Sequence, residues 1–145
     1  MKRLIAMVGL PRSGKGTWAR AYYYLNRPPP PIVPPIVCPD SIRLALHGQR
    51  YIQEAEPIVW VVAKLMVRAL FLAGHSTVIL DSCNQTRKRR DEWQSEHWVT
   101  VFKEINTSSS ECVKRAKAEG DRYIIPIIER MAAESEPLDD DERRL

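Results

Sequence analysis

The sequence is poor in the residues that build disulfide frameworks and metal centres. It has three cysteines, Cys38, Cys83 and Cys112, and no two of them stand at CxxC spacing. The three histidines are scattered, and none has a partner at the spacing of a metal-ligand pair. These absences argue against a disulfide-stapled scaffold and a zinc site. They predict reduced thiols in a cytoplasmic protein, in the host cytoplasm if the chain is encoded by a phage.

Long apolar runs are also missing. The most apolar stretch, residues 58–72, contains Lys64 and Arg68 and is too short to span a bilayer. The first residues pass from a short apolar run directly into a glycine-containing loop, without the long apolar region and small-residue cleavage site of a signal peptide. We therefore expect residues 58–72 to lie in a buried amphipathic helix.

The overall composition is that of one soluble domain, because the chain has 145 residues with 44% apolar and 28% charged side chains. The charge is unevenly distributed. Residues 1–133 hold 20 Lys/Arg and 12 Asp/Glu, whereas residues 134–145 hold six acids and two arginines. A basic body suits a polyanionic partner, although a kinase that binds only nucleotides would also be basic.

Short apolar segments alternate with helical patterns along the chain, which predicts a parallel sheet with helices on both faces. We expect an α/β fold of the P-loop NTPase type, with about four strands in the order 2-3-1-4. The predicted strands are residues 2–8, 36–38, 77–81 and 98–105. The predicted helices are residues 15–25, 39–46, 54–73, 86–95, 109–119 and 126–134, with Asp40 or Ser41 as the cap of the second and a serine as the cap of the fifth.

Two segments fall outside this alternation. Residues 28–35 read PPPPIVPP and predict a stiff polyproline-II connection, with a PxxP ligand for a partner module as the alternative. Residues 135–145 are polar and acidic and are expected to be frayed. The predicted kinase domain is therefore residues 1–134, and residues 135–145 form a tail.

A phosphate-binding loop follows the first predicted strand and opens the first helix, the context in which a GxxxxGK match is specific. Glycines in such a loop let backbone N–H groups curl around phosphate oxygens, and the lysine adds a full positive charge. The residue after Lys15 is Gly16 rather than the usual Ser or Thr, so Thr17 or bridging waters would contact the Mg²⁺ ion that accompanies ATP. The expected ATP-binding residues are Gly9, Leu10, Pro11, Arg12, Ser13, Gly14, Lys15, Gly16 and Thr17.

Phosphoryl transfer also needs groups that orient the acceptor hydroxyl and organise the metal, and these are expected at the carboxyl ends of the strands. Asp40 follows the second strand, and Arg43 lies three residues on, hence on the same helix face. They are candidates for a general base and an acceptor-binding guanidinium, although in isolation they would equally fit a helix cap and a solvated residue.

A second acid, Asp81, ends the third strand, where it could reach the Mg²⁺ shell beside Thr17. Ser82 and Asn84 follow and offer polar groups to an acceptor phosphate. Arg115 and Arg122 flank a polar loop after the fifth helix, as the arginines of a lid would. The spacing does not decide between these two lid candidates.

These residues resemble the kinase domain of phage polynucleotide 5′-hydroxyl kinases. The resemblance rests on the run Gly-x-Pro-x-Ser-Gly-Lys-x-Thr-Trp-Ala-Arg over residues 9–20, on Asp40 with Arg43, and on the strand end Asp81-Ser82-x-Asn84. It extends over residues 1–134 and includes Val113-Lys114-Arg115 and the stretch 125–131. It implies that Lys15 binds the β/γ-phosphates, that Asp40 is the general base and that Arg43 contacts acceptor and phosphate. It further implies that Ser82 holds an acceptor phosphate, and that Arg115 or Arg122 supports the transition state from the lid.

The chain also looks like the phage kinases that phosphorylate hydroxymethyluracil bases within DNA. The helix predicted over residues 86–95 begins with four consecutive cations and continues to Trp93. Cations in this run could grip backbone phosphates, with Arg87, Lys88 and Arg90 as the expected contacts, and Trp93 could stack on a base. The alternative is a solvated helix face with Trp93 in the core.

The sequence thus favours an ATP- and Mg²⁺-dependent kinase that acts on a DNA hydroxyl, either a polynucleotide 5′-hydroxyl or a hydroxymethyl group on a base. One alternative is a small-molecule, nucleoside or nucleotide kinase on the same scaffold, which the GKGT form of the loop also suits. A second is a nucleotide-binding interaction module that performs no chemistry. The presence of both Asp40 and Asp81 argues against that module.

Overall fold

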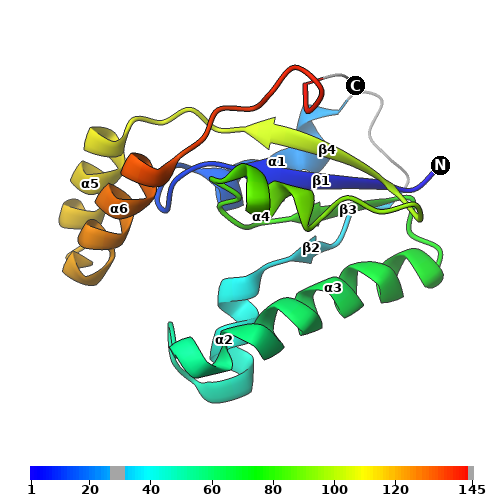
Figure 1. The fold of residues 1–145 in the computed structure, drawn as a ribbon, viewed down its shortest axis with the longest axis horizontal. Coiled ribbons are helices and arrows are strands. Elements are labelled where there is room, and N and C mark those ends of the chain that lie inside the picture. Colours follow the sequence, from blue (N-terminus) through cyan, green and yellow to red (C-terminus); the bar gives the residue numbers. More distant parts are fainter. Residues whose placement is uncertain (27–31, 144–145) are drawn as a thin grey trace.

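Four parallel strands form the centre of the molecule, and helices cover both faces (Figure 1). The structure is a computed structural model that describes residues 1–26 and 32–143. Its sheet order is β2-β3-β1-β4, and each neighbouring pair runs parallel. The predicted fold class and strand order are therefore confirmed. The strands are β1 (Arg3–Val8), β2 (Ile36–Val37), β3 (Thr77–Leu80) and β4 (Val99–Glu104).

The central strand β1 explains why helices lie on both sides of the sheet. Its residues alternate between two apolar clusters, as a strand buried on both faces requires. Leu4 and Ala6 pack in one cluster with the inner side of a long helix, and Ile5 and Met7 pack in another with Ala19 of the first helix. The two faces of the sheet are thus occupied by different helices.

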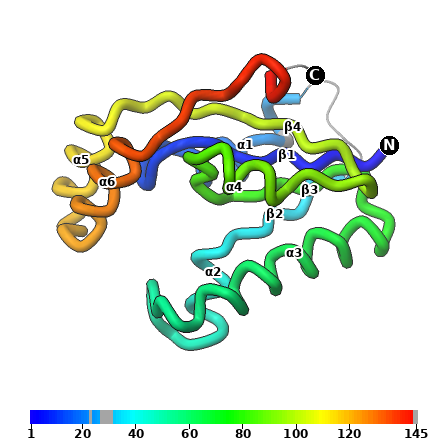
Figure 2. The backbone as a smooth tube through the Cα atoms, in the orientation of Figure 1, coloured from blue at the N-terminus to red at the C-terminus, as the bar shows by residue number. Residues whose placement is uncertain are grey.

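The helices lie close to the predicted ranges. Figure 2 shows that α3 runs along one side of the sheet, while α5 and α6 lie side by side beyond the end of β1 where the strand enters the glycine loop. A small apolar cluster that includes Cys112 and Ile128 joins α5 to α6. The helical segments are α1 (Lys15–Leu25), α2 (Pro39–His47), η1 (Gln53–Ala55), α3 (Glu56–Leu72), α4 (Arg87–Asp91), α5 (Ser109–Ala118), η2 (Arg122–Ile124) and α6 (Ile125–Glu134).

Two helix boundaries differ from the expectation for a physical reason. Cys38 is the N-cap residue of α2 and Pro39 opens the helix, so Asp40 lies in the first turn and neither it nor Ser41 is the cap. Helix α4 ends at Asp91 because the chain turns Trp93 into the core, where its side chain is fully buried. The serine cap predicted for α5 is confirmed, since the Ser108 side chain accepts from the Glu111 N–H.

The C-terminal segment packs against the domain as far as residue 143, so the expectation of a frayed tail is wrong there. The backbone N–H of Glu136 donates to the Gln85 carbonyl at 2.8 Å, and Leu138 is only 6% exposed. Glu142 is buried against Arg90. In the proline-rich segment, residues 28–31 lie outside the described residues, and the Pro35 carbonyl accepts from the Ile79 N–H.

Within the described ranges, no helix combines the length and apolarity needed to cross a bilayer. The three cysteines are free thiols, as expected. In the same ranges, no group of three or more His, Cys, Asp or Glu side chains forms a ready-made metal cage.

Candidate active site

The glycine loop between β1 and α1 is shaped by two positions that require glycine. Gly14 has a φ of 104°, in the left-handed region that side chains disfavour. A Cβ on Gly9 would lie 2.7 Å from Ser13 Oγ and 3.0 Å from the Ile105 carbonyl oxygen, which is backbone and cannot swing away. The hydroxyl of Thr107, which follows β4, donates to the Ser13 carbonyl at 2.7 Å and steadies the loop.

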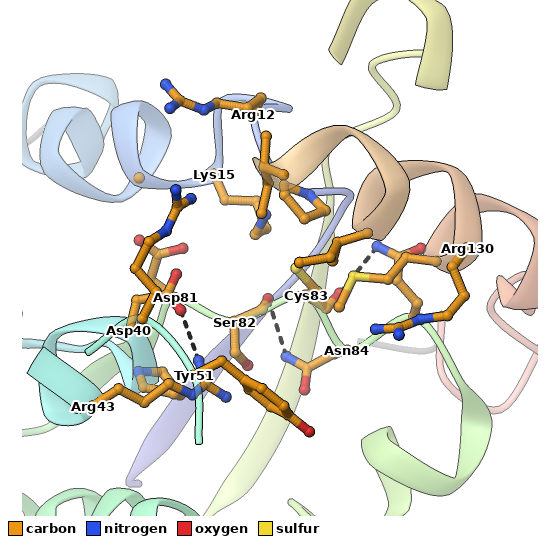
Figure 3. Close-up of a pocket in the computed structure, with 18 of the residues that line it drawn as sticks. Arg12, Lys15, Asp40, Arg43, Tyr51, Asp81, Ser82, Cys83, Asn84 and Arg130 are labelled. Atoms are coloured by element: carbon orange, nitrogen blue, oxygen red, sulfur yellow. Dashed lines mark hydrogen bonds and ion pairs between the residues drawn. The ribbon is translucent and has the colours of Figure 1, made fainter. Parts of the chain in front are cut away.

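Lys15 points back into this loop (Figure 3). It is 7% exposed, and its Nζ donates to the Leu10 carbonyl at 2.7 Å. The ammonium therefore lies inside the curve of the loop, where the backbone N–H groups and the start of α1 also favour an anion. The residues fit the polyphosphate of a nucleotide.

A cleft of about 1390 Å³ opens from the loop. Of the predicted ATP-binding residues, Gly9, Leu10 and Ser13 lie behind its surface, and Leu10 and Ser13 are buried there. The others line the cleft: Pro11, Arg12, Gly14, Lys15, Gly16 and Thr17. Predicted residues from outside the loop meet them there, namely Asp40, Arg43, Asp81, Ser82, Asn84 and Arg115.

Asp81 faces Gly16 across the floor of the cleft. A Cβ on Gly16 would stand 3.1 Å from Asp81 Oδ2, so the position that usually carries a hydroxyl is directly beside this carboxylate. Burial raises the pKa of Asp81, and the nearby Lys15 ammonium opposes the shift. Asp81 is half-buried, and no cation among the described residues bonds to its carboxylate. Such a carboxylate suits Mg²⁺, which commonly uses one or two carboxylates together with phosphates and waters. Thr17, the other residue predicted at the metal, is exposed and lines the same cleft.

Arg43, predicted to contact the acceptor, is held by two carboxylates. Its Nη1 donates to Asp40 at 2.7 Å, while its Nε and Nη2 bind the two oxygens of Glu56 at 2.9 and 2.6 Å. Only 13% of the Arg43 side chain is exposed, in contrast to 84% for Asp40. The arginine is therefore preoriented, and the Asp40 carboxylate is open to an incoming group. Figure 3 shows both carboxylates, Asp40 and Asp81, on the same side of the cleft below Lys15.

Ser82 and Asn84 form the middle of the floor. Asn84 adopts a φ of 49° and donates through Nδ2 to the Met7 carbonyl at 2.7 Å, which ties the floor to β1. Within the described residues, Ser82 Oγ and Asn84 Oδ1 are buried atoms without a hydrogen-bond partner. Such atoms are uncommon in folded proteins and are consistent with a polar ligand in the cleft.

The two arginines predicted to belong to a lid occupy different places. Arg115 lines the cleft, and its Nη1 donates to the Arg12 carbonyl at 3.1 Å. Arg122 is in η2 and is not among the residues that line the cleft. The structure therefore brings Arg115, and not Arg122, to the phosphate loop.

An ion-pair cluster around Asp121 includes three residues that line the cleft, Arg12, Arg50 and Glu119. Asp121 receives Arg12 at 2.7 Å and Arg50 at 2.8 Å, and Arg12 also pairs with Glu119. Hydrogen bonds, first from Arg50 and then from Arg12, hold the pKa of Asp121 well below its usual range. Arg50 also lies over the Tyr123 ring, with its guanidinium carbon 4.6 Å from the centroid. The cluster joins the glycine loop, the end of α5 and the segment after α2.

Of the four cations of α4, Arg89 lines the cleft, whereas the three expected to contact nucleic acid do not. Arg90 is fully buried in an ion pair with Glu142, and Arg87 binds Asp91, Asp139 and Asp141. Lys88 is exposed but does not line the cleft. The expectation that Arg90 contacts nucleic acid is wrong, because the buried Glu142 carboxylate neutralises its charge inside the protein. Trp93 is likewise buried and cannot stack on a base.

Sequence reasoning missed several residues that line the cleft. Arg20 belongs to the Trp-Ala-Arg run and had a sequence signal, since it lies one helical turn beyond Gly16. Arg89 belongs to the four-cation run but was not among the contacts expected from it. The others stand in no motif, and their positions depend on how α2, α3 and α6 pack. The missed residues include Arg20, Arg50, Tyr51, Glu56, Trp60, Arg89 and Arg130.

Comparison with known proteins finds similarity at the level of structure. No protein-family profile matches the chain, and no curated protein matches it in sequence. A chain in a structure of the Pnkp1/Rnl/Hen1 RNA repair complex superimposes with a TM-score of 0.72 and 21% identity, over 92% of this chain. A chain in a second Pnkp1/Rnl/Hen1 structure gives a TM-score of 0.65 and 26% identity over 79% of this chain.

These likenesses show that the four-stranded parallel α/β fold is shared with a chain of each complex, over 92% and 79% of this chain. The two structures are of Pnkp1/Rnl/Hen1 complexes and do not bear on the phage kinases that modify DNA bases. The chain covers 43% of the length of the first of these proteins and 38% of the second, so it corresponds to less than half of either.

Proposed function

We propose that this chain is an ATP-dependent kinase that phosphorylates the 5′-hydroxyl end of a polynucleotide. The observation that carries the proposal is the shared cleft. It brings together the phosphate-loop lysine, Lys15, and the half-buried acid Asp81 with the open carboxylate of Asp40 and its partner Arg43. A nucleotide-binding module would need Lys15 but has no use for an exposed carboxylate held against an arginine at the other side of the cleft.

In this mechanism the residues divide between donor and acceptor. Lys15 and the glycine loop bind the β- and γ-phosphates, and Arg115 approaches the same phosphates from α5. Asp40 accepts the proton of the attacking hydroxyl, and Arg43 orients the acceptor next to it. Ser82 offers the O–H of its unpartnered Oγ, together with the Arg43 guanidinium, to the acceptor's first phosphate. The unpartnered Oδ1 of Asn84 can only accept, so it suits a hydroxyl of the acceptor rather than its phosphate. When bound by Asp81 and Thr17, Mg²⁺ would neutralise charge that develops on the transferred group.

A strand end fits the cleft better than a base within duplex DNA. Gripping a duplex would need a basic outer face, but Arg90 is buried and Arg87 is paired with acids of the C-terminal segment. The structural likeness to a chain of an RNA repair complex also favours an end-processing role. The expected DNA acceptor therefore remains one of two candidates beside RNA.

The test is transfer from γ-labelled ATP to four acceptors: a 5′-hydroxyl RNA oligomer, the same sequence in DNA, a hydroxymethyluracil-containing duplex with phosphorylated ends, and free nucleosides. Oligomers that already carry a 5′-phosphate serve as matched controls. We expect label on the 5′-hydroxyl oligomers and none on the phosphorylated controls. Label on nucleosides alone, or on the duplex alone, would replace the proposal with a nucleoside kinase or a base kinase. No transfer to any acceptor while ATP still binds would favour a nucleotide-binding module.

A further inference from the structure

A tryptophan in the cleft has two arginine guanidinium groups close to its ring. Trp60, in α3, has the guanidinium carbon of Arg89 4.0 Å from its ring centroid and that of Arg43 5.8 Å away. The indole packs against the core, where it meets the buried Trp93 ring edge-on at 6.3 Å between centroids. All three residues, Arg43, Trp60 and Arg89, line the cleft. Trp60 is thus a fixed platform that holds a guanidinium from α4 beside one from α2.

Neighbouring carboxylates bind Arg43 more tightly than they bind Arg89. Arg43 donates three hydrogen bonds to Glu56 and Asp40 and is only 13% exposed. Arg89 binds Glu92 at 2.9 Å, and both of these side chains are 34% exposed. A pair so open to solvent is weak, so Arg89 can exchange Glu92 for another anion at little cost. Stacking on Trp60 would keep its planar fork in place during that exchange.

The position of α4 is itself fixed, although the helix is short. Next to Arg89 in the chain, Arg90 donates to Glu142 through Nε at 2.7 Å and to the Glu136 and Pro137 carbonyls at 3.0 and 3.1 Å. The C-terminal segment therefore clamps the helix from behind. Arg89 reaches the cleft from the other side, and the Thr86 side chain caps the same helix and lines the same cleft.

A path of contacts leads from the proposed base to Arg89. Asp40 binds Arg43, Arg43 lies at the Trp60 ring, and Arg89 covers that ring more closely. An acceptor whose end reaches Asp40 would therefore pass Arg43 first and Arg89 later. Guanidinium forks match phosphate oxygens in geometry as well as charge. Successive forks along one wall suit successive phosphates of a strand.

We infer that Arg89, positioned by Trp60, is a subsite for an internucleotide phosphate of the acceptor strand beyond the phosphate at Arg43. The inference rests on the proposed function and deepens it. The subsite selects polynucleotides over mononucleotides, because only an acceptor with at least two phosphates occupies both arginines. Arg89 contacts the acceptor, whereas Trp60 acts through Arg89.

The experiment compares a nucleoside 3′-monophosphate, which has one phosphate, with a 5′-hydroxyl tetranucleotide, for the wild-type chain and for Arg89→Gln. We expect Arg89→Gln to raise KM for the tetranucleotide about tenfold, the usual scale of one lost charged hydrogen bond. Its kcat, its KM for ATP and its kinetics with the monophosphate stay at wild-type values. Lys88→Gln is the matched control, since it removes the same charge from the same helix outside the cleft.

Further variants separate stacking from charge. Arg89→Lys keeps the charge without the planar fork and should recover only part of the tetranucleotide affinity. Trp60→Leu should mimic Arg89→Gln, and Trp60→Phe, which keeps an aromatic ring, should not. Equal KM changes for both acceptors, or equal effects of Lys88→Gln and Arg89→Gln, would overturn the subsite while leaving the kinase intact. Absence of transfer from wild type to either acceptor would instead overturn the proposed function, and the subsite with it.

Discussion

Arg90 and Glu142 lie 52 residues apart in the chain and form an ion pair in the interior, with Arg90 Nε 2.7 Å from Glu142 Oε1. Their side chains are 0% and 2% exposed. The second Glu142 oxygen accepts from Arg90 Nη2 and from the Asp139 N–H, so both oxygens are bonded. The pair joins the acidic C-terminal segment to α4, and it makes that segment part of the folded domain.

Removing one partner of this pair should destabilise the protein strongly. Glu142→Gln leaves the buried Arg90 guanidinium without its counterion, and breaking a buried pair in this way typically costs about 3–5 kcal/mol. The measurement is the urea midpoint of unfolding, followed by fluorescence. Asp140→Asn is the control, because it removes one negative charge from an exposed position in the same segment. A change for Glu142→Gln no larger than for Asp140→Asn would show that the pair contributes little to stability.

The α4 region marks the limit of what sequence could predict. The run from Arg87 to Arg90 reads as a solvent-facing basic patch, because four cations in a helix of five residues carry no periodicity that separates an inner from an outer face. The direction of each side chain depends on a partner distant in sequence. Arg90 is buried only because Glu142 returns to it, and Arg89 faces the cleft only because Trp60 of α3 packs below it.

The phosphate loop and the strand ends were predictable because their information is local. Gly9 and Gly14 are required by backbone geometry within a single loop, and Asp81 follows directly from the end of a buried strand. The rule that ligands bind at the carboxyl ends of parallel strands then places Asp40 near Asp81 without any knowledge of side-chain packing. Glu56, which orients Arg43, comes from another helix and had no such signal.

Replacing the proposed base should abolish transfer without weakening ATP binding. The Asp40 side chain is 84% exposed, and Arg43 keeps its two bonds to Glu56 when Asp40 is lost. We expect Asp40→Asn to lower kcat by about 10²- to 10⁴-fold, the usual contribution of general base catalysis. ATP affinity, measured by calorimetry, and the melting midpoint should match wild type. Loss of ATP binding in this variant would assign Asp40 a structural role.

Gly9 and Gly16 should respond differently to alanine. At Gly9 the new methyl would meet the Ile105 carbonyl at 3.0 Å, so the loop or β4 must shift, at a cost of about 1–3 kcal/mol and with loss of ATP affinity. At Gly16 the close atoms are Arg20 Nη1 at 3.0 Å and Asp81 Oδ2 at 3.1 Å, which are ends of side chains that can move. Gly16→Ala should therefore retain wild-type stability. Thermal melts and ATP titrations compare the two, and equal losses would contradict this account of the loop.

Replacing Asp81 should stabilise the metal-free protein by an amount that depends on pH, and it should remove transfer activity. Burial raises its pKa above the ordinary value of 3.8, so the folded state binds this proton more tightly than the unfolded state does. Below pH 3.8 the carboxyl is protonated in both states, so no buried charge lowers the stability of the folded state. As pH rises through the raised pKa, the carboxyl becomes charged and destabilises the fold.

Asp81→Asn should therefore melt higher than wild type near neutral pH, and the difference should shrink as pH falls toward the ordinary value. With ATP and Mg²⁺ present the order should reverse, because only wild type gains the metal contact, and the variant should lose transfer activity. Melting curves from pH 7 to pH 4, with and without Mg²⁺ at constant ATP, test both halves of the prediction. A lower melting point for Asp81→Asn at neutral pH without metal would mean that the carboxylate is stabilised by partners in the fold rather than reserved for a cation.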